Sequence, residues 1–263
     1  GWHVVGFDKN KKLLEEIEHD GIETVKSLKE LVERLPSKKT IWRMLPAGKI
    51  VDETIDSLSP LLGKGYTLID GGNSYFKDSI RISKKLSKLD INYVDVGVSG
   101  GPKGALEGAS LMIGGSKRNF KRLEQLYKDL AYEDGYSFFE GAGAGHFVKM
   151  VHNGIEYGMM QAIAEGFNIL KKSSYSLDLK KVADVYNDGA VIESKLVGWL
   201  KDAFELHGED LKEVTGKVSH SGEGQWTVDT AKEMRLKAKV QNKRLKQTNR
   251  PGPSALERGL HPA

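Results

Sequence analysis

The sequence predicts an α/β protein in which a mostly parallel sheet is followed by an all-helical second domain. Up to about residue 140, short apolar segments alternate with segments of helical spacing, a pattern typical of βαβ units. Beyond Leu170 the strand-like segments stop and only helical patterns follow. The length of 263 residues, of which 39% are hydrophobic, is enough for two ordinary domains.

The apolar segments of the first part are taken as strands because polar or glycine-rich turns bound them. The expected strands are Trp2–Phe7, Ile22–Val25, Thr40–Leu45, a run from Tyr66 into the turn at 70–74, Ile91–Gly101, Ser110–Gly115 and Tyr136–Glu140. The expected helices are Lys11–His19, Ser27–Leu35 with Ser27 as its cap, Ile50–Leu62, Phe76–Leu89 and Asn119–Leu130. Ligands bind at the carboxyl ends of parallel strands, so the strand ends are the first places to look for a site.

The second part is expected to consist of helices only. A long helix starts near Gly145, and two more are expected at Ser173–Asp188 and Ala190–Leu206. We therefore predict domains at 1–144 and 145–234, followed by a basic tail at 235–263. This tail has eight Lys/Arg and one Glu, a net charge of +7, so the overall +4 leaves −3 for the rest. Because no aromatic residues lie between its charges, we expect a disordered or non-native tail and no nucleic-acid partner.

The composition excludes several classes of site and location. There are no cysteines, which excludes disulfides and thiolate metal sites. The histidines show no spacing suggestive of metal ligands, so no metal is expected. No run of 18 apolar residues and no signal peptide is present, which predicts a cytoplasmic protein without a membrane partner.

The long helix carries a polar stripe where a core helix should be apolar. Five polar residues fall at offsets 0, +3, +4, +7 and +8, within an arc of about 140°: Lys149, His152, Asn153, Glu156 and Tyr157. We expect the apolar residues on the opposite side to pack on protein: Val148, Val151, Ile155, Gly158 and Met159. The stripe suits proton transfer and oxyanion binding. It could also be a solvated face, although Asn, Gly and Tyr are poor choices for an exposed helix centre.

Three strand ends carry groups that could face the same cleft. Asp8 could bind the hydroxyls of an adenosine ribose, or it could start an ordinary turn. Asn73 projects from the turn DGGNS, and Ser99 begins the glycine-rich loop GVSGGPKGALEG. Each motif alone is compatible with a plain turn. No G-x-G-x-x-G precedes Trp2, so a Rossmann-like dinucleotide fold would have its first βα unit missing from this sequence.

Three segments closely resemble the decarboxylating 6-phosphogluconate dehydrogenases: DGGNSYFKDSIR, GVSGGPKGALEGASLMIGG and GAGHFVKMVHNGIEYGMMQ. The shorter, mostly bacterial branch looks nearest, because SGEGQWTV stands where the longer enzymes carry K-G-T-G-K-W-T. The resemblance covers about residues 1–234. It implies a Rossmann-like cofactor domain and conversion of 6-phosphogluconate to ribulose 5-phosphate and CO₂ with reduction of NAD(P)⁺, a step of the pentose phosphate pathway. It also implies a homo-oligomer, dimer or tetramer, in the intact enzyme.

The resemblance also implies roles for single residues. Lys149 matches the general base that removes the 3-hydroxyl proton, and Glu156 matches the acid that protonates C1 of the enediol. The matching substrate-binding positions are Asn73, Ser99, Gly100, Gly101, His152, Asn153 and Tyr157, with Tyr157 towards the phosphate. The matching cofactor-binding positions are Asp8, Leu45, Pro46, Ala47 and Asn73. The acidic Asp8 favours NAD, while Lys9 beside it leaves NADP open.

The sequence departs from the family in three places. Without the glycine fingerprint, the chain as written is expected to bind nicotinamide cofactor poorly. After about Met234 the likeness is expected to end, and Ser221 and Glu223 replace phosphate-gripping residues of the longer enzymes. Two other interpretations of the sequence stay open. One is a β-hydroxyacid dehydrogenase acting on a smaller acid, and the other is an inactive truncated remnant, against which Lys149 and Glu156 argue.

Overall fold

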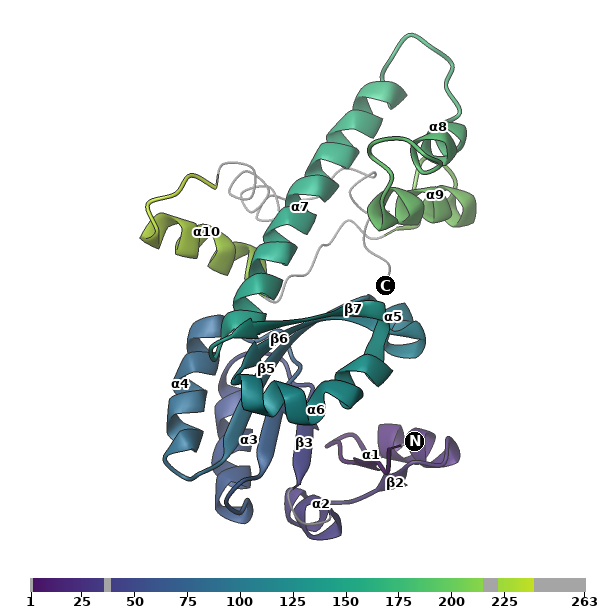
Figure 1. Cartoon of the computed structure of the whole chain (residues 1–263). Helices are drawn as coiled ribbons and strands as arrows, with labels where there is room; N and C mark the ends of the chain where they lie inside the picture. Colours follow the sequence, from purple (N-terminus) through teal and green to yellow (C-terminus); the bar gives the residue numbers. More distant parts are fainter. Residues whose placement is uncertain (1, 36–38, 215–221, 239–263) are drawn as a thin grey trace. The chain divides into compact units, whose positions relative to one another are not determined.

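The computed structural model describes residues 2–35, 39–214 and 222–238 (Figure 1). The chain divides into two units, Gly1–Lys149 and Met150–Ala263. The first unit is α/β, and the described residues of the second are helical. The predicted fold class is therefore confirmed. Most of the predicted basic tail, from residue 239 onwards, lies outside the described residues.

The strands of the first unit form two sheets. In the smaller sheet β1 (Val5–Gly6) pairs in parallel with β2 (Glu23–Thr24). The larger sheet has the order β3-β4-β5-β6-β7, made of β3 (Thr40–Arg43), β4 (Thr67–Asp70), β5 (Asn92–Ser99), β6 (Ala109–Gly115) and β7 (Ala131–Glu140). All neighbours are parallel except β5 and β6, which are antiparallel. The connection between those two is too short for the crossover that a parallel pair needs.

The two sheets are separate because β1 and β3 belong to different sheets and do not pair with each other. Dinucleotide-binding sheets have the strand order 3-2-1-4-5-6, in which the first strand lies between the second and the fourth. If β1, β2 and β3 correspond to the second, third and fourth strands of that order, the division falls at the position of the first. The expected additional βα unit stays a prediction, with which this topology is compatible.

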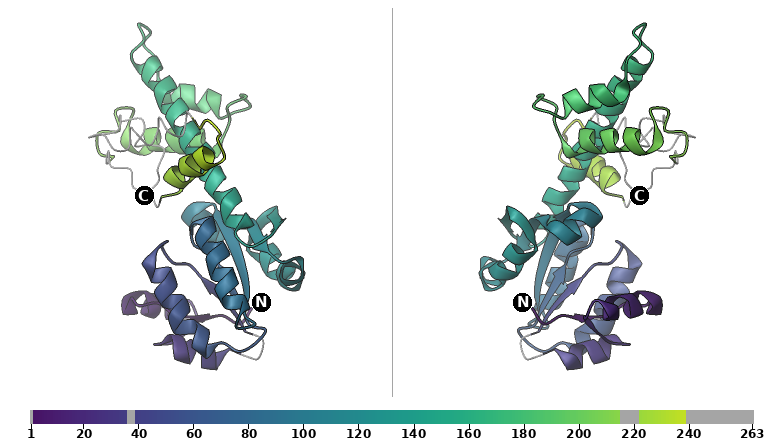
Figure 2. Two further views of the ribbon diagram at one scale, coloured as in Figure 1. Left: turned by 90° about the vertical axis from the view of Figure 1, so that its left-hand side faces the viewer. Right: turned by 90° about the vertical axis from the view of Figure 1, so that its right-hand side faces the viewer.

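Helices cover both faces of the larger sheet (Figures 1 and 2). The helices of this unit are α1 (Lys11–His19), α2 (Leu28–Arg34), α3 (Lys49–Leu58) with the 3₁₀ turn η1 (Ser59–Leu61), α4 (Phe76–Ser87), α5 (Gly101–Glu107) and α6 (Lys117–Leu130). Alternate strand residues point to opposite faces: Leu68 and Tyr93 pack with α3 and α4, whereas Ile69 and Val94 pack with α6. The same alternation puts Asp95, Gly97 and Ser99 of β5 on the face that carries α4.

Several predicted boundaries are wrong, for local reasons. Only Val5–Gly6 of the predicted strand Trp2–Phe7 is a strand. Gly101–Glu107, expected to be an open loop, is a helix with a proline in its first turn, where proline is well tolerated. In the second unit the helices begin later than predicted, because Asp178 and Ser194 act as N-caps.

The second unit is built around the long helix α7 (Ala144–Lys171), whose start near Gly145 was predicted correctly. The other helices are α8 (Leu179–Tyr186), α9 (Lys195–His207) and α10 (Glu223–Glu233). The core joins Met160 and Phe167 of α7 to Leu179 and Leu200. Helix α10 contacts α7 as well, since the Thr227 hydroxyl donates to the Met150 carbonyl at 2.8 Å. Over the described ranges, none of the helices has the length and apolar character needed to cross a membrane.

Candidate active site

Lys149 is buried in the first unit, with 7% of its surface exposed. Its side-chain stem lies on Gly97 of β5, where any Cβ would overlap the Cβ and Cγ of the lysine. Ser99 lies on the same face of β5, two residues further along and half-buried at the carboxyl end of the strand. The fold thus sets the predicted base at the strand end that carries the predicted Ser99, Gly100 and Gly101.

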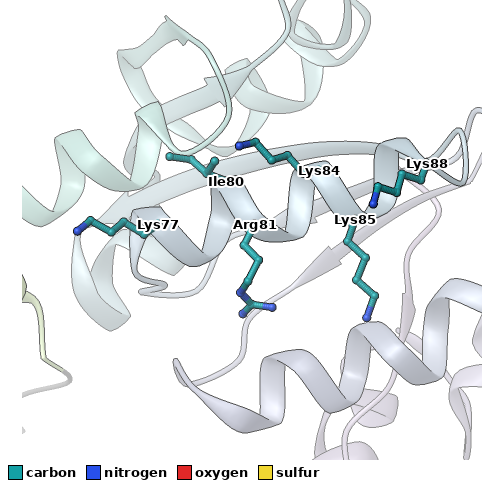
Figure 3. A pocket seen from close by; sticks show the side chains of 6 residues that line it. All are labelled: Lys77, Ile80, Arg81, Lys84, Lys85 and Lys88. Carbon is teal, nitrogen blue, oxygen red and sulfur yellow. The ribbon is translucent and has the colours of Figure 1, made fainter.

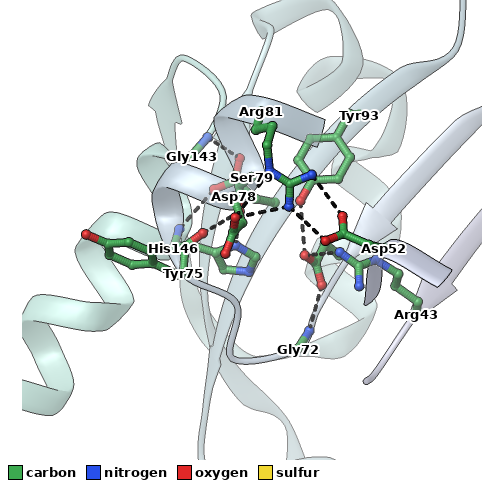
Figure 4. A network of polar contacts seen from close by, with 12 residues as sticks. Arg43, Asp52, Gly72, Tyr75, Asp78, Ser79, Arg81, Tyr93, Gly143 and His146 are labelled. Carbon is green, nitrogen blue, oxygen red and sulfur yellow. Dashed lines mark hydrogen bonds and ion pairs between the residues drawn. The ribbon is translucent and has the colours of Figure 1, made fainter. Parts of the chain in front are cut away.

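The first turn of α7 is tied to β5 and α4. Asp95, fully buried on β5, accepts hydrogen bonds from the Gly143 amide at 2.7 Å and from the His146 amide at 2.9 Å. Burial raises the pKa of Asp95, an effect that His146 and these two amides oppose. Nδ1 of His146 lies 2.7 Å from Oγ of Ser79 in α4 (Figure 4). Asp95 was not among the residues predicted from the sequence, although a carboxylate inside the apolar run NYVDVGV was a usable signal.

Glycines allow α7 to rest directly on the sheet. A Cβ at Gly145 would lie 2.7 Å from the Asp95 carbonyl oxygen and from the Gly114 nitrogen. A Cβ at Gly114 would lie 2.5 Å from a carboxylate oxygen of Asp95. Both distances are shorter than any real Cβ contact. The helix therefore approaches β5 and β6 as closely as backbone allows, which fixes the position of its first turns.

The two loops predicted to contact a cofactor touch one another. A Cβ at Gly72 would overlap the carbonyl oxygen of Leu45, and the Gly71 amide donates to the Arg43 carbonyl at 2.9 Å. Asn73, which follows this turn, is exposed. In the other loop, Leu45 and Ala47 are half-buried and Pro46 is exposed. The predicted cofactor positions at Leu45, Pro46, Ala47 and Asn73 therefore belong to neighbouring loops.

A buried ion pair lies beneath these loops. Arg43, buried on β3, pairs with Asp70 of β4. The Tyr93 hydroxyl donates to the same carboxylate at 3.0 Å, and the Gly72 amide donates to its other oxygen at 3.2 Å (Figure 4). Burial raises the pKa of Tyr93 well above its usual value, and the Asp70 charge adds to this. Asp70 thus supports the turn that presents Asn73.

The polar stripe continues along α7 into the second unit. Asn153 is buried, whereas His152, Glu156 and Tyr157 are half-buried. Nδ1 of His152 lies 3.0 Å from Oδ1 of Asn153 and 3.7 Å from a carboxylate oxygen of Glu156. The alternative interpretation, in which this stripe is a fully solvated face, is therefore wrong.

The opposite side of α7 departs from the sequence-based expectation. Gly158 is buried, but Ile155 is 53% exposed and Met159 is 42% exposed. These two side chains were expected to pack on protein, but both are exposed. An exposed apolar pair on this helix is instead available for association.

Asp8 is exposed just after β1. Its carboxylate accepts a hydrogen bond from the Asn10 amide at 2.7 Å, the ordinary turn interaction of an aspartate. Because the carboxylate has further acceptor positions, this turn is compatible with ribose binding as well.

One surface hollow is lined by cations but is not a convergent site. It encloses about 480 Å³ beside α4, and its lining residues are Lys77, Ile80, Arg81, Lys84, Lys85 and Lys88. Their side chains diverge around the helix (Figure 3). Arg81 donates to Asp52 at 2.9 Å, and Lys85 pairs with Asp56, so both are engaged with α3. Within the described parts of the chain, no cluster of three or more His, Asp or Glu could hold a metal ion.

Comparison with protein families finds two matches that together span most of the chain. Residues 1–140 match the NAD binding domain of 6-phosphogluconate dehydrogenase, and residues 145–244 match the C-terminal domain of 6-phosphogluconate dehydrogenase. The second match passes Met234, where the likeness was expected to end. That expectation was wrong for the first residues of the tail.

Individual relatives agree with these matches. YqeC of Bacillus subtilis is 44% identical over 237 residues, which cover 90% of this chain and 79% of YqeC. The NAD⁺-dependent decarboxylating 6-phosphogluconate dehydrogenase of Haloferax volcanii is 42% identical, covering 90% of this chain and 78% of that enzyme. Among solved structures, 6-phosphogluconate dehydrogenase of Plasmodium falciparum, determined apo, with NADP⁺ and with 6-phosphogluconate, has a TM-score of 0.83 at 28% identity. It is matched over 95% of this chain and 57% of its own length.

Proposed function

The chain belongs to the 6-phosphogluconate dehydrogenase family, and from that premise we propose that it oxidatively decarboxylates 6-phosphogluconate to ribulose 5-phosphate and CO₂. The observation that carries the proposal is Lys149. A buried lysine on α7, seated on Gly97 beside the strand end of Ser99, has the position and chemistry that a general base needs.

The proposed oxidant is NAD⁺, with NADP⁺ as the second choice. The residues present fit the nucleoside parts of the cofactor. Asp8 offers an exposed carboxylate after β1 for ribose hydroxyls and would repel a 2′-phosphate, although the exposed Lys9 lies beside it. The 263 residues contain no G-x-G-x-x-G turn for a pyrophosphate, so we assign no binding site to that part of the cofactor. When bound, NAD⁺ accepts a hydride from C3 of the substrate.

Lys149 handles the proton of the 3-hydroxyl group. It removes this proton as the C3 hydride departs, which leaves a 3-keto acid and an ammonium group. It then returns the proton to the ketone oxygen as the bond between C1 and C2 breaks, so that CO₂ leaves and an enediol remains. A lysine must be partly neutral to start this cycle, and burial favours the neutral form of an amine.

Glu156 supplies the proton that turns the enediol into the ketose. Its carboxyl group protonates the carbon left by CO₂, which becomes C1 of ribulose 5-phosphate. The hydroxyl proton of the neighbouring carbon goes to Lys149, and that carbon becomes the ketone. His152, 3.7 Å from this carboxylate, can hold the acid in place. We assign substrate binding to Asn73, Ser99, Gly100, Gly101, His152, Asn153 and Tyr157, of which Tyr157 is assigned to the phosphate.

The test uses Lys149→Met, with Lys172→Met, at an exposed position after α7, as the matched control. Each is made in the 263-residue chain and in a fused chain, in which a strand–turn–helix unit carrying G-x-G-x-x-G is joined at Gly1. In the fused chain, Lys149→Met should lower turnover of 6-phosphogluconate at least about 10³-fold, while calorimetry still detects substrate binding. Lys172→Met should behave as the parent protein. Unchanged kcat in Lys149→Met would remove the lysine from its role.

We also propose that the protein is a homo-oligomer that associates through its second unit. Support comes from large apolar side chains of this unit that lie exposed: Ile155, Met159, Ile169, Val185, Ile192 and Leu206. Association through this unit would cover these side chains, which lie on α7, α8, α9 and the connection between α8 and α9.

A further inference from the structure

A buried carboxylate that takes no part in the proposed chemistry holds the start of the helix that carries Lys149. The first amide groups of an α-helix have no partners within the helix and must be satisfied from outside. For α7, Asp95 of β5 does this, binding the Gly143 and His146 amides through its two different oxygens. A helix cap usually comes from the residue just before the helix, whereas here it comes from a strand about fifty residues earlier in the chain.

The distance between Asp95 and Gly97 along β5 matches the distance between Gly145 and Lys149 along α7. Asp95 and Gly97 point to the same face of the strand, and residues two apart on a strand are separated by about 6.6 Å. Along a helix, the rise from Gly145 to Lys149 is about 6 Å. A helix that runs along β5 therefore meets Asp95 with its first turn and Gly97 with Lys149, and both contacts are present.

Together the two contacts define where Lys149 lies. The two hydrogen bonds of Asp95 fix the height and rotation of the first turn, because they engage amides on different residues. Gly97 removes the side chain that would otherwise push Lys149 away from the strand. The bond between His146 and Ser79 holds the same turn from the side of α4.

We propose that Asp95 is a positioning residue for Lys149. It acts by anchoring the first turn of α7 one helical turn before the lysine, and it has no contact with substrate. The inference rests on the proposed function for the role of Lys149, but the anchoring itself does not. Loss of the carboxylate leaves the fold in place and allows the start of α7 to shift, and a displacement of about 1 Å at a catalytic group can lower the rate about 100-fold.

The test compares Asp95→Asn with Val96→Ala, each made both in the 263-residue chain and in the fused chain described above. Asparagine keeps the volume and one acceptor oxygen but turns an NH₂ group towards the second amide, so one of the two hydrogen bonds is lost. Val96, the next residue of β5, is fully buried on the opposite face, where it packs in the cluster with α6. Val96→Ala thus destabilises the same strand without touching α7.

Two measurements are made on each variant. Amide hydrogen exchange in the 263-residue chain, corrected for global stability, reports on Gly143 and His146. Steady-state kinetics of the fused chain with 6-phosphogluconate and NAD⁺ give kcat and KM. In Asp95→Asn we expect exchange at these two amides to rise at least tenfold over Val96→Ala. We expect kcat to fall about 100-fold with KM within about threefold, since position and not binding is lost.

Equal exchange in the two variants would overturn the proposal, and so would a wild-type kcat in Asp95→Asn. A general loss of stability would raise amide exchange and lower kcat to the same extent in both variants. The Val96→Ala control therefore distinguishes it from loss of the anchor. If the fused chain without either substitution does not oxidise 6-phosphogluconate, that result counts against the proposed function. The exchange measurement then decides the role of Asp95 by itself.

Discussion

The polar residues of this protein differ in whether the fold engages their polar groups or whether they are assigned to chemistry. Asp70, Asp95 and Arg43 are buried and bound to other protein groups, so their effects are structural. Glu156 and His152 are only half-buried. A helical periodicity alone predicted the polar stripe that contains Lys149. It could not predict Asp95, because the partners of that carboxylate are brought to it by the tertiary fold.

Asp95 should make stability depend on pH in the acid range. Burial raises its pKa in the folded protein above the ordinary carboxyl value, so the folded state binds the proton more tightly than the unfolded state does. The stability that this group contributes is complete below about pH 4 and is lost as the pH rises through the folded-state pKa.

Urea unfolding of the wild type and of Asp95→Asn across this range measures the effect. The free energy of unfolding of the wild type, relative to the variant, should decrease as the pH increases from about 4. A difference that grows with pH would show that the two amide hydrogen bonds outweigh desolvation.

Two buried tyrosines should respond in opposite directions to loss of the hydroxyl. Tyr127 is fully buried against Phe120, and its hydroxyl has no hydrogen-bond partner among the described residues. Tyr93 donates to Asp70. Tyr127→Phe should therefore leave stability equal or raise it by about 1 kcal/mol, and Tyr93→Phe should lower it by about 1–3 kcal/mol. Thermal unfolding of the two variants, side by side, checks this, and a less stable Tyr127→Phe would contradict it.

At the scale of elements, the contact of α7 with the sheet depends on residues that have no side chain. Gly97, Gly114 and Gly145 each lie where a Cβ would overlap neighbouring atoms. Glycines before a helix are typical of a turn, which explains only their backbone freedom. Their second role, close packing, was not predictable because it depends on which strand faces the helix.

Gly145→Ala and Gly166→Ala form a matched pair on α7. A Cβ at Gly145 would meet backbone atoms of β5 and β6, whereas at Gly166 nothing lies within 4 Å. Gly145→Ala should lower the free energy of unfolding by about 1–3 kcal/mol or more. Gly166→Ala should raise it by up to about 1 kcal/mol through helix propensity. Denaturant unfolding gives both values, and similar effects at the two positions would argue against the close packing.

Element types were more predictable than element ends. The alternation of strands and helices was confirmed, and helix α1 has the predicted bounds Lys11–His19. The errors concern contacts that periodicity does not contain. Asp178 and Ser194 cap helices in the middle of patterns that looked helical throughout, and the antiparallel turn of β6 follows from the short connection after β5.

At the scale of the whole molecule, exposed apolar residues of the second unit predict self-association. Ile169 and Val185 are 71% and 67% exposed. In sedimentation velocity experiments the wild type should behave as a dimer or larger, and Ile169→Glu with Val185→Glu should shift it towards the monomer. Leu106→Glu, on the exposed helix α5 of the first unit, should leave the assembly unchanged. A monomeric wild type, or equal dissociation by Leu106→Glu, would contradict the predicted interface.

The fold was predictable at this scale because it depends on patterns repeated along the chain. The candidate site was predictable only in part, because its residues in the first unit come from β5, from the loops after β3 and β4, and from Lys149 near the start of α7. Motif resemblance named Lys149, Ser99 and Asn73. It did not reveal the supporting residues Arg43, Asp70 and Asp95, whose roles follow from pairing between strands and from the contact between β5 and α7.

The most direct test of the central claim is the ratio of CO₂ released to nicotinamide reduced, measured with the fused chain and 6-phosphogluconate labelled with ¹⁴C at C1. One labelled CO₂ is expected for each NADH formed, and both should be lost in Lys149→Met. NADH formed without labelled CO₂, or oxidation of smaller 3-hydroxy acids in place of 6-phosphogluconate, would contradict it.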